Sequence, residues 1–413
     1  MIKRINIEQL KPGMYIHDIN CGWMGHPFLF NAFKVNTAQD IDKISAYGIR
    51  EFYIDTSRGM DVQDAQTEEE ISAEIHEQVT QVVKNQDKKI VAPALLKEEI
   101  VAARIVHHQA NGVVHNILSD IRLGKQIEVE QLKPVVENIT DSIFRNQDAL
   151  LALSRIKQKD DYTFQHSVSV CALLVAFCRA MGYERDVILD VGMGGLLHDV
   201  GKMKVPDYIL NKPGELTEDE FNTMQSHAAL GRDILRQTEG VTDIAAMIAG
   251  QHHERFDGTG YPDKLKGGEI SQFGQLASIV DVYDALTSNR IYHTGLAPFM
   301  ALKKLYEWSK FHFDEPLVQH FIRAIGIYPT GTLVRLESGL IGVVIKPGTD
   351  NLLHPVVRAM YDVQRETHIS PRDIDLSLPA SQGGGDRIVA HELPEKWGID
   401  PYAFLPGATI DIH

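Results

Sequence analysis

Histidine and aspartate residues on separate apolar segments are the side chains best suited to do chemistry in this sequence. Seven of them lie on the inward face of an amphipathic pattern or directly beside an apolar segment. Burying one unpaired imidazole or carboxylate is strongly unfavourable, so a set of this size indicates that the side chains converge on cations. The set consists of His166, His198, Asp199, His227, His252, His253 and Asp281.

Imidazole and carboxylate ligands together select ions such as Fe, Mn, Co, Ni or Zn. The set is too large for one ion with open positions, but it suits two ions about 3.5–4 Å apart if Asp199 bridges them. Such a pair lowers the pKa of a shared water towards about 7 and holds a bridging hydroxide at neutral pH. A phosphodiester has charged oxygens that bind metal ions well. We therefore predict metal-dependent hydrolysis of a phosphodiester.

Helices are predicted to carry most of these residues. His166 begins an apolar helix, and Asp281 lies within the apolar segment ASIVDVYDAL. Thr217 and Glu220 form a capping box, and the helix that they begin has His227 on its inward side. The fold class expected is mainly α.

The two ends of the chain show strand signals instead. Near the N-terminus, IREFYID alternates as a strand does, and TAQDIDKISAYG predicts a short helix that Gly48 ends. After Tyr328, TLVRL and LIGVVI predict a hairpin, with HPVVRAMYD as a third strand. The regions expected are a small α+β module at 1–60, a helical linker at 61–140, a catalytic domain at 141–330 and a small β-rich extension with a tail at 331–413.

A narrow apolar stripe at helical spacing marks the start of the linker. It consists of Ile71, Ile75, Val79 and Val82, in a segment otherwise rich in Glu, Gln, Asp and Lys. A solvated connecting helix is the first interpretation, and a dimerising helix, hence a homodimer, is the second.

Composition restricts the classes of function. The net charge of -15 argues against binding a nucleic-acid polymer, which needs a positive surface. The N-terminus has no apolar segment typical of a signal peptide, and the longest apolar run, Val168 to Cys178, is too short to span a bilayer. The three cysteines form no C-x-x-C pair, and Cys171 and Cys178 are interpreted as core residues. A cytoplasmic protein that does not bind membranes is expected.

The spacing of the chemical residues resembles a known family. His166, His198-Asp199 and Asp281 are similar to the H…HD…D signature of HD-domain phosphohydrolases. HD-x-GK at 198–202, then His227 and HHE-x-x-DG-x-GYP at 252–262, resemble the extended signature of the HD-GYP family. The resemblance covers residues 145–330. It implies a helical HD-type metal-dependent domain that hydrolyses cyclic di-GMP to the linear dinucleotide pGpG and, in some members, GMP, with two divalent metals, Fe or Mn.

The resemblance also assigns roles to single residues. It places His166, His198, Asp199 and Asp281 on one metal, and Asp199, His227, His252 and His253 on the other. Asp199 and Lys202 are the catalytic residues that it implies, and Lys202 contacts the scissile phosphate or the bridging water. Arg290 resembles a phosphate-binding arginine, and Tyr261 would stack on a guanine or contact a partner. The alternatives are a surface cation for Lys202, a helix-end arginine for Arg290 and a structural loop residue for Tyr261.

Two departures limit what the resemblance implies, and a third position has two interpretations. Tyr162 stands where some members have a glutamate for a third metal, so two metals are expected. His293 stands where the family often has a second cation, which weakens the expected grip on the second phosphate and leaves cyclic GMP-AMP open as the preferred substrate. Asp284, one helical turn after Asp281, either orients a ligand histidine or lies on the surface.

Two other classes of function compete with the active phosphodiesterase. One is a non-catalytic sensor or scaffold for a cyclic dinucleotide. The other keeps the metals but runs other chemistry, as a di-iron oxygenase or a hydrolase of other nucleotides. The N-terminal module could sense, dimerise or recruit a GGDEF-type cyclase or another signalling protein.

Overall fold

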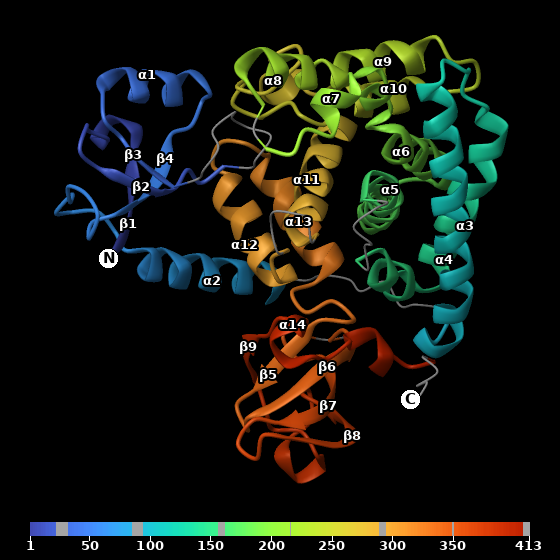
Figure 1. Cartoon of the computed structure of the whole chain (residues 1–413). Helices are drawn as coiled ribbons and strands as arrows, with labels where there is room; N and C mark the ends of the chain where they lie inside the picture. Colours follow the sequence, from blue (N-terminus) through green and yellow to red (C-terminus); the bar gives the residue numbers. More distant parts are fainter. Residues whose placement is uncertain are drawn as a thin grey trace.

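The computed structural model describes residues 1–21, 32–84, 94–155, 162–214, 216–288, 295–348 and 351–407. In these residues an N-terminal α+β module, a central helical region and a C-terminal antiparallel sheet follow one another along the chain (Figure 1). The mainly α fold class is confirmed.

The N-terminal module is a small antiparallel sheet with one helix. Its strand order is β1-β4-β2-β3, and every pairing is antiparallel. The helix α1 begins after Thr37, whose side chain accepts a hydrogen bond from the backbone N–H of Asp40, and Gly48 follows its end at a φ of +71°. The bounds are β1 Ile2–Asn6, β2 Tyr15–Asp18, β3 Phe33–Lys34, α1 Ala38–Ala46 and β4 Glu51–Asp55, with a 3-10 helix at Ile7–Gln9.

The helical region is built around α5, whose side chains are apolar on nearly every face. Helices α4, α6, α11 and α13 all pack against it. The helices are α2 Glu68–Lys84, α3 Leu96–Arg122, α4 Val129–Ser154, α5 Tyr162–Ala180, α6 Arg185–Leu197, α7 Asp207–Leu210, α8 Glu218–Gln225, α9 His227–Arg236, α10 Asp243–Gln251, α11 Gln272–Thr287, α12 Pro298–Trp308 and α13 Glu315–Ile325. Short 3-10 helices cover Val200–Lys204 and Gly267–Glu269.

Within the described residues, Thr163–Ala180 of α5 is long and apolar enough to cross a membrane by length and composition, although 78% of that window is buried inside the protein. Burial to this extent is typical of a core helix. Cys171 and Cys178 of the same helix are buried, which agrees with their interpretation as core residues.

The apolar stripe of the predicted linker helix faces the protein itself. Ile71, Ile75, Val79 and Val82 are buried in α2, which packs against α12 and α13. The apolar stripe of α2 is therefore neither exposed to solvent nor free to form a dimer interface. The sequence pattern shows one apolar face but does not show which helices, more than 200 residues later, cover it.

The C-terminal sheet has the order β8-β7-β6-β5-β9 and lies beyond the ends of α12 and α13 (Figure 1). The predicted hairpin and third strand are confirmed as antiparallel β5, β6 and β7. The bounds are β5 Leu333–Leu336, β6 Leu340–Lys346, β7 Val356–Asp362, β8 Thr367–Asp375 and β9 Ile388–His391, followed by α14 Pro394–Trp397. Short 3-10 helices lie at Ala380–Gln382 and Pro401–Phe404.

Candidate metal centre

The structure brings the seven predicted ligands together from five places in the helical region. His166 lies in the first turns of α5, and Asp281 lies in the middle of α11. The other five lie at helix ends: His198 and Asp199 follow α6, His227 begins α9, and His252 and His253 follow α10. All except His253 are less than 9% exposed.

Asp199 lies between two pairs of imidazoles. Its Oδ1 atom lies 3.5 Å from His227 Nε2 and 3.7 Å from His252 Nε2. Its Oδ2 atom lies 3.3 Å from His198 Nε2 and 3.8 Å from His166 Nε2. Each carboxylate oxygen therefore faces its own pair of nitrogens, as a carboxylate that bridges two cations requires.

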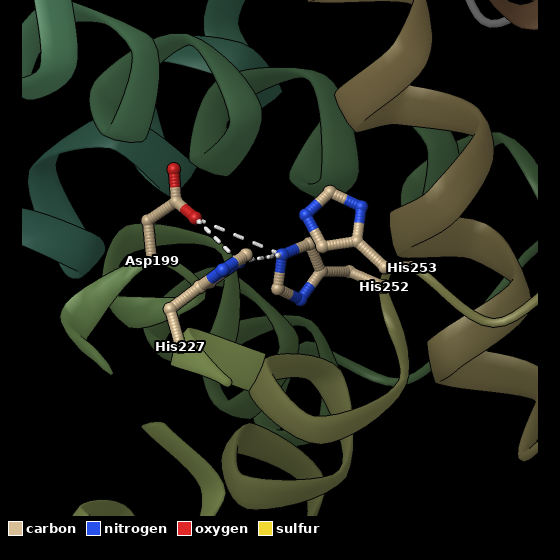
Figure 2. A group of neighbouring side chains, drawn as sticks. All are labelled: Asp199, His227, His252 and His253. Atoms are coloured by element: carbon tan, nitrogen blue, oxygen red, sulfur yellow. Dashed lines mark hydrogen bonds and ion pairs between the residues drawn. The ribbon is translucent and has the colours of Figure 1, made fainter. Parts of the chain in front are cut away.

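The ligand atoms fall into two compact groups that share Asp199. Within each group, the possible ligand atoms all lie within 4.8 Å of one another. Figure 2 shows the larger group, in which the imidazoles of His227, His252 and His253 converge beside one Asp199 oxygen. The smaller group contains His166 and His198, and Asp281 Oδ1 lies 2.9 Å from His166 Nε2 and 3.8 Å from His198 Nε2.

Backbone carbonyls fix the orientation of three imidazoles. The Nδ1 atoms of His198, His227 and His252 lie 2.8, 2.6 and 2.9 Å from the carbonyl oxygens three residues earlier in the chain. A carbonyl oxygen only accepts, so each Nδ1 carries a proton and Nε2 is the nitrogen left to bind a metal. The carbonyls near a helix end need such donors, which explains why these histidines lie at helix ends. These contacts were not predicted from the sequence. The place of His198 and His252 directly after a helical segment could have indicated them.

Asp284 orients the fourth imidazole. Its Oδ2 atom accepts a hydrogen bond from His166 Nδ1 at 2.6 Å, and the carboxylate is buried. Of the two interpretations of Asp284, orientation of a ligand histidine is therefore the one that the contact supports. Burial opposes a charged His166, but Asp281 and Asp284 outweigh it and raise the pKa of that imidazole.

The residues present fit divalent transition metals. His198 Nε2, Asp199 Oδ1 and His253 Nε2 are buried with no hydrogen-bond partner in the described part of the chain. Buried polar atoms are normally paired, so these three atoms lack partners of the kind that cations provide. Burial lowers the pKa of His227 to about 3 and that of His253 well below its usual range, which leaves neutral imidazoles suited to bind metal.

The two carboxylates are ionised as metal ligands must be. Burial opposes the charge of Asp199, but Lys202 and His198 outweigh burial and hold the pKa of Asp199 well below its usual range. Burial likewise opposes the charge of Asp281, and the hydrogen bond with His166 holds its pKa well below its usual range. The site therefore combines the anionic oxygens of Asp199 and Asp281 with the neutral nitrogens of His227 and His253, a set of donors that Fe and Mn accept.

Lys202 lies inside the site rather than on the surface. Its Nζ atom is 2.6 Å from Asp199 Oδ2, and its side chain is only 16% exposed. The 3-10 helix Val200–Lys204 turns the lysine back towards the carboxylate three residues earlier. The contact places one fixed positive charge next to the shared ligand.

Tyr261 packs against a candidate ligand. Its ring is tilted by 32° over the His253 ring with 4.8 Å between centroids, and its hydroxyl is buried with no hydrogen-bond partner in the described residues. Glu254 holds this loop, because its buried carboxylate accepts hydrogen bonds from the backbone N–H groups of Asp263 and Leu265 at 2.7 and 3.0 Å. No role was predicted for Glu254 from the sequence, although its place directly after His252 and His253 could have indicated one.

Arg290 and His293 lie outside the described residues. The expected phosphate-binding role of Arg290 therefore stays a prediction. The side chain of Tyr162, where a third metal ligand would stand, also lies outside the described part.

Gly201 allows the HD-x-GK turn to pack directly on α9. A Cβ atom at this position would lie 1.9 Å from the carbonyl oxygen of His227. We expect Gly201→Ala to lower the free energy of unfolding by about 1–3 kcal/mol, because the contacting atom is backbone and cannot move aside alone. Thermal unfolding measures the change. The control is Gly112→Ala in α3, where a Cβ meets nothing within 4 Å. This variant should stabilise the helix by about 0.5–1 kcal/mol. Equal effects of the two variants on the free energy of unfolding would contradict the close packing at Gly201.

Asp284→Asn tests the orientation of His166. The amide keeps the size of the side chain but removes the charge that favours the Nδ1–H tautomer, so metal affinity should fall about 10–100-fold. Titration of metal-free protein with Mn²⁺ measures the change, and Asp186→Asn, an exposed carboxylate in the first turn of α6, is the control. Unchanged affinity in Asp284→Asn would show that the contact does not orient a ligand.

Comparison with known proteins identifies the family. A family model described as HD domain matches residues 150–317, and one described as Domain of unknown function (DUF3391) matches residues 2–132. A cyclic di-GMP phosphodiesterase of Pseudomonas aeruginosa is 36% identical over 400 residues, which cover 97% of this chain and 94% of the relative. The chain belongs to the HD-GYP family of cyclic dinucleotide phosphodiesterases.

Other known proteins resemble smaller shares of the chain. A 3′3′-cGAMP-specific phosphodiesterase of Vibrio cholerae is 31% identical over 203 residues, covering 49% of this chain and 44% of the relative. A solved HDG"Y"P protein from Bdellovibrio bacteriovorus is 18% identical, with a TM-score of 0.45, and the match covers 78% of this chain and 98% of that one. The resemblance predicted from the HD and GYP motifs is confirmed at the level of the family.

Proposed function

We propose that this phosphodiesterase hydrolyses cyclic di-GMP to the linear dinucleotide pGpG, with two divalent transition metals, Fe or Mn, held by the seven residues of the candidate centre. The observation that carries the proposal is the position of Asp199, with one oxygen facing His227 and His252 and the other facing His198 and His166. The relative that matches almost the full length is named a cyclic di-GMP phosphodiesterase, which favours this substrate.

A bound pair of such ions supplies an activated water and positive charge for the phosphoryl oxygens. The residues of the chain hold the reacting groups in place. Asp199 and the four oriented imidazoles form a rigid set of donors, because each Nδ1–H is already engaged. Lys202 holds a positive charge beside Asp199, where it can stabilise negative charge that develops on the phosphate. Tyr261 covers the imidazole of His253 and limits access of bulk water on that side.

Arg290 is proposed to bind a phosphate of the dinucleotide, as its place in the family motif implies. Recruitment of a GGDEF-type cyclase and formation of a homodimer also stay predictions. Cyclic GMP-AMP is the alternative substrate, since several relatives carry cGAMP-specific names.

The test compares substrates and separates products. Anaerobically purified protein is loaded with Mn²⁺ or Fe²⁺ and incubated with cyclic di-GMP or 3′3′-cGAMP, and products are resolved by chromatography. We expect faster turnover of cyclic di-GMP and accumulation of pGpG. Turnover of 3′3′-cGAMP alone would reassign the substrate, and metal-loaded protein that turns over neither would support a sensor or scaffold.

A further inference from the structure

The N-terminal module contacts the loop that covers the metal centre. This loop, residues 254–262, runs from Glu254 to Pro262 and contains Tyr261, the residue that packs on His253. The family model that matches the module carries no function in its description. The contact is made by the segment between α1 and β4, so the module reaches the loop by its own backbone and by one arginine.

Backbone packing makes the first part of the contact. Gly48 follows α1 at a φ of +71°, and a Cβ atom there would lie 2.3 Å from Thr259 Cγ2. Position 48 therefore requires a glycine for two reasons: its backbone is left-handed, and Thr259 occupies the space where a side chain would lie. The neighbouring Tyr47 ring meets the Phe221 ring of α8 edge-on at 6.4 Å.

A charge pair makes the second part. Arg50 Nη2 lies 3.7 Å from Asp257 Oδ2, and that oxygen is buried with no hydrogen-bond donor among the described residues. The other oxygen, Oδ1, accepts hydrogen bonds from the backbone N–H and hydroxyl of Thr259 at 3.0 and 2.7 Å. Asp257 thus connects Arg50 to the turn that leads to Tyr261. The guanidinium of Arg50 also lies over the Phe311 ring at 5.2 Å.

A buried polar network anchors the module to α12 next to this contact. Glu307 Oε1 accepts hydrogen bonds from the Tyr53 hydroxyl at 2.6 Å and from Asn20 Nδ2 at 3.1 Å, and Arg4 Nη1 lies 3.6 Å away. Asn20 in turn accepts a hydrogen bond from Trp308 Nε1 at 2.9 Å. Oε1 of Glu307 thus meets three groups of the module across the junction, and Figure 1 shows the module beside α12.

We propose that the N-terminal module is a clamp that holds loop 254–262 in the conformation that completes the catalytic site. Arg50 and Gly48 are positioning residues in this device. Loss of their contacts frees the Asp257 turn, and the movement reaches Tyr261 and the imidazole of His253. Any signal that loosens the module from α12 then lowers phosphodiesterase activity without itself binding at the metal centre.

The test measures the loop directly in the full-length protein. Hydrogen–deuterium exchange is followed in peptides that cover residues 254–265. There the backbone N–H groups of Gly258 and Tyr261 donate to the carbonyl oxygens of Arg255 and His253, and that of Asp263 donates to the Glu254 carboxylate. Arg50→Ala should speed exchange in these peptides about two- to fivefold, as expected for loss of a half-exposed ion pair. The same variant should lower kcat/KM by a similar factor while metal content stays at the wild-type level, and Arg50→Lys should restore both readouts in part.

Matched controls separate the clamp from general destabilisation. Arg58→Ala removes an exposed arginine of the same module that lies over Tyr15 and should leave both readouts unchanged. Gly48→Ala should speed exchange in the loop about tenfold or more. Gly124→Ala is its control, because it strains the backbone in the same way (φ +84°) after α3, where a Cβ meets nothing within 4 Å, and it should leave exchange in the loop unchanged.

A double-mutant cycle shows whether Arg50 acts through Asp257. If it does, Arg50→Ala combined with Asp257→Asn should exchange no faster than Asp257→Asn alone. Wild-type exchange in the loop of Arg50→Ala, or an equal effect of Arg58→Ala, would overturn the clamp. The exchange readout needs no turnover, so it fails or succeeds independently of the substrate and metals proposed above.

Discussion

Replacing Asp199 by alanine is expected to lower phosphodiesterase turnover by about a thousand-fold or more and to release bound transition metal. The carboxylate faces all four oriented imidazoles, so its loss removes a ligand from both groups at once. It also leaves the Lys202 ammonium without its partner at 2.6 Å, which adds repulsion to any cation that binds. Metal analysis and a product assay on the same sample measure the two losses together.

The Asp199→Asn variant gives a sharper result. The Lys202 ammonium can only donate, so the amide oxygen of the introduced side chain should replace Oδ2 and the amide NH2 should replace Oδ1. The NH2 group would then face His227 and His252 and repel a cation there, while the His166 and His198 group keeps an oxygen ligand. We expect Asp199→Asn to hold about one ion per chain where the wild type holds two.

Asp120→Ala serves as the control for both variants. Its carboxylate pairs with Lys125 at the surface and lies far from the centre in the chain, so metal content and turnover should stay at the wild-type level. Full metal content in Asp199→Ala would contradict a bridging role for this carboxylate.

Lys202→Ala is expected to lower kcat by about a hundred- to a thousand-fold while the metals remain bound at neutral pH. The lysine contributes fixed positive charge beside Asp199 and makes no direct contribution to the two ligand groups. Stopped assays at saturating substrate, combined with metal analysis, separate this effect from metal loss. Lys204→Ala, an exposed lysine in the same 3-10 helix, should behave as the wild type.

The same variant should shift the pH dependence of metal binding. Lys202 is the largest influence that lowers the pKa of Asp199, so its removal raises that pKa. A carboxylate with a higher pKa is protonated at a higher pH, and protonation competes with the metal. The acid limb of metal binding should therefore move to higher pH in Lys202→Ala. An unchanged acid limb together with an unchanged kcat would show that Lys202 is not coupled to the centre.

The sequence singled out the seven residues of the candidate centre because their chemistry conflicts with their apolar surroundings. His166, His227 and Asp281 lie on faces that are otherwise apolar, and the fold places His166 and His227 beside Asp199 and Asp281 beside His166. The motif spacing supplied the same set through the family. Local elements were also predictable where the signal is local, as with the capping box of Thr217 and Glu220.

Long-range contacts could not be predicted in this way. The expected single helix after Thr217 is two helices, α8 and α9, which meet at Ser226, and the start of α9 is what turns His227 towards Asp199. The stripe of α2 is covered by helices far away in the chain. Strand β9, from a tail whose sequence has no clear pattern, pairs with β5.

The docking of the N-terminal module was likewise beyond the sequence. Nothing in the sequence distinguishes Glu307 and Asn20 from other polar residues. Only the fold shows that their buried side chains form a hydrogen bond, although they lie 287 residues apart in the sequence. Residues that act through a second residue, such as Asp284 and Glu254, leave the same weak signal. Their partners are set by packing rather than by spacing.

The measurement that tests the account most directly is the number of metal ions per chain at which activity appears. Metal-free protein is titrated with Mn²⁺ under anaerobic conditions, and cyclic dinucleotide hydrolysis is recorded at each step. We predict that turnover rises only as the second ion binds and that it reaches its plateau at two ions per chain. Full turnover with one ion per chain, or in protein freed of metal by a chelator, would contradict the central claim that Asp199 joins two cations in one catalytic site.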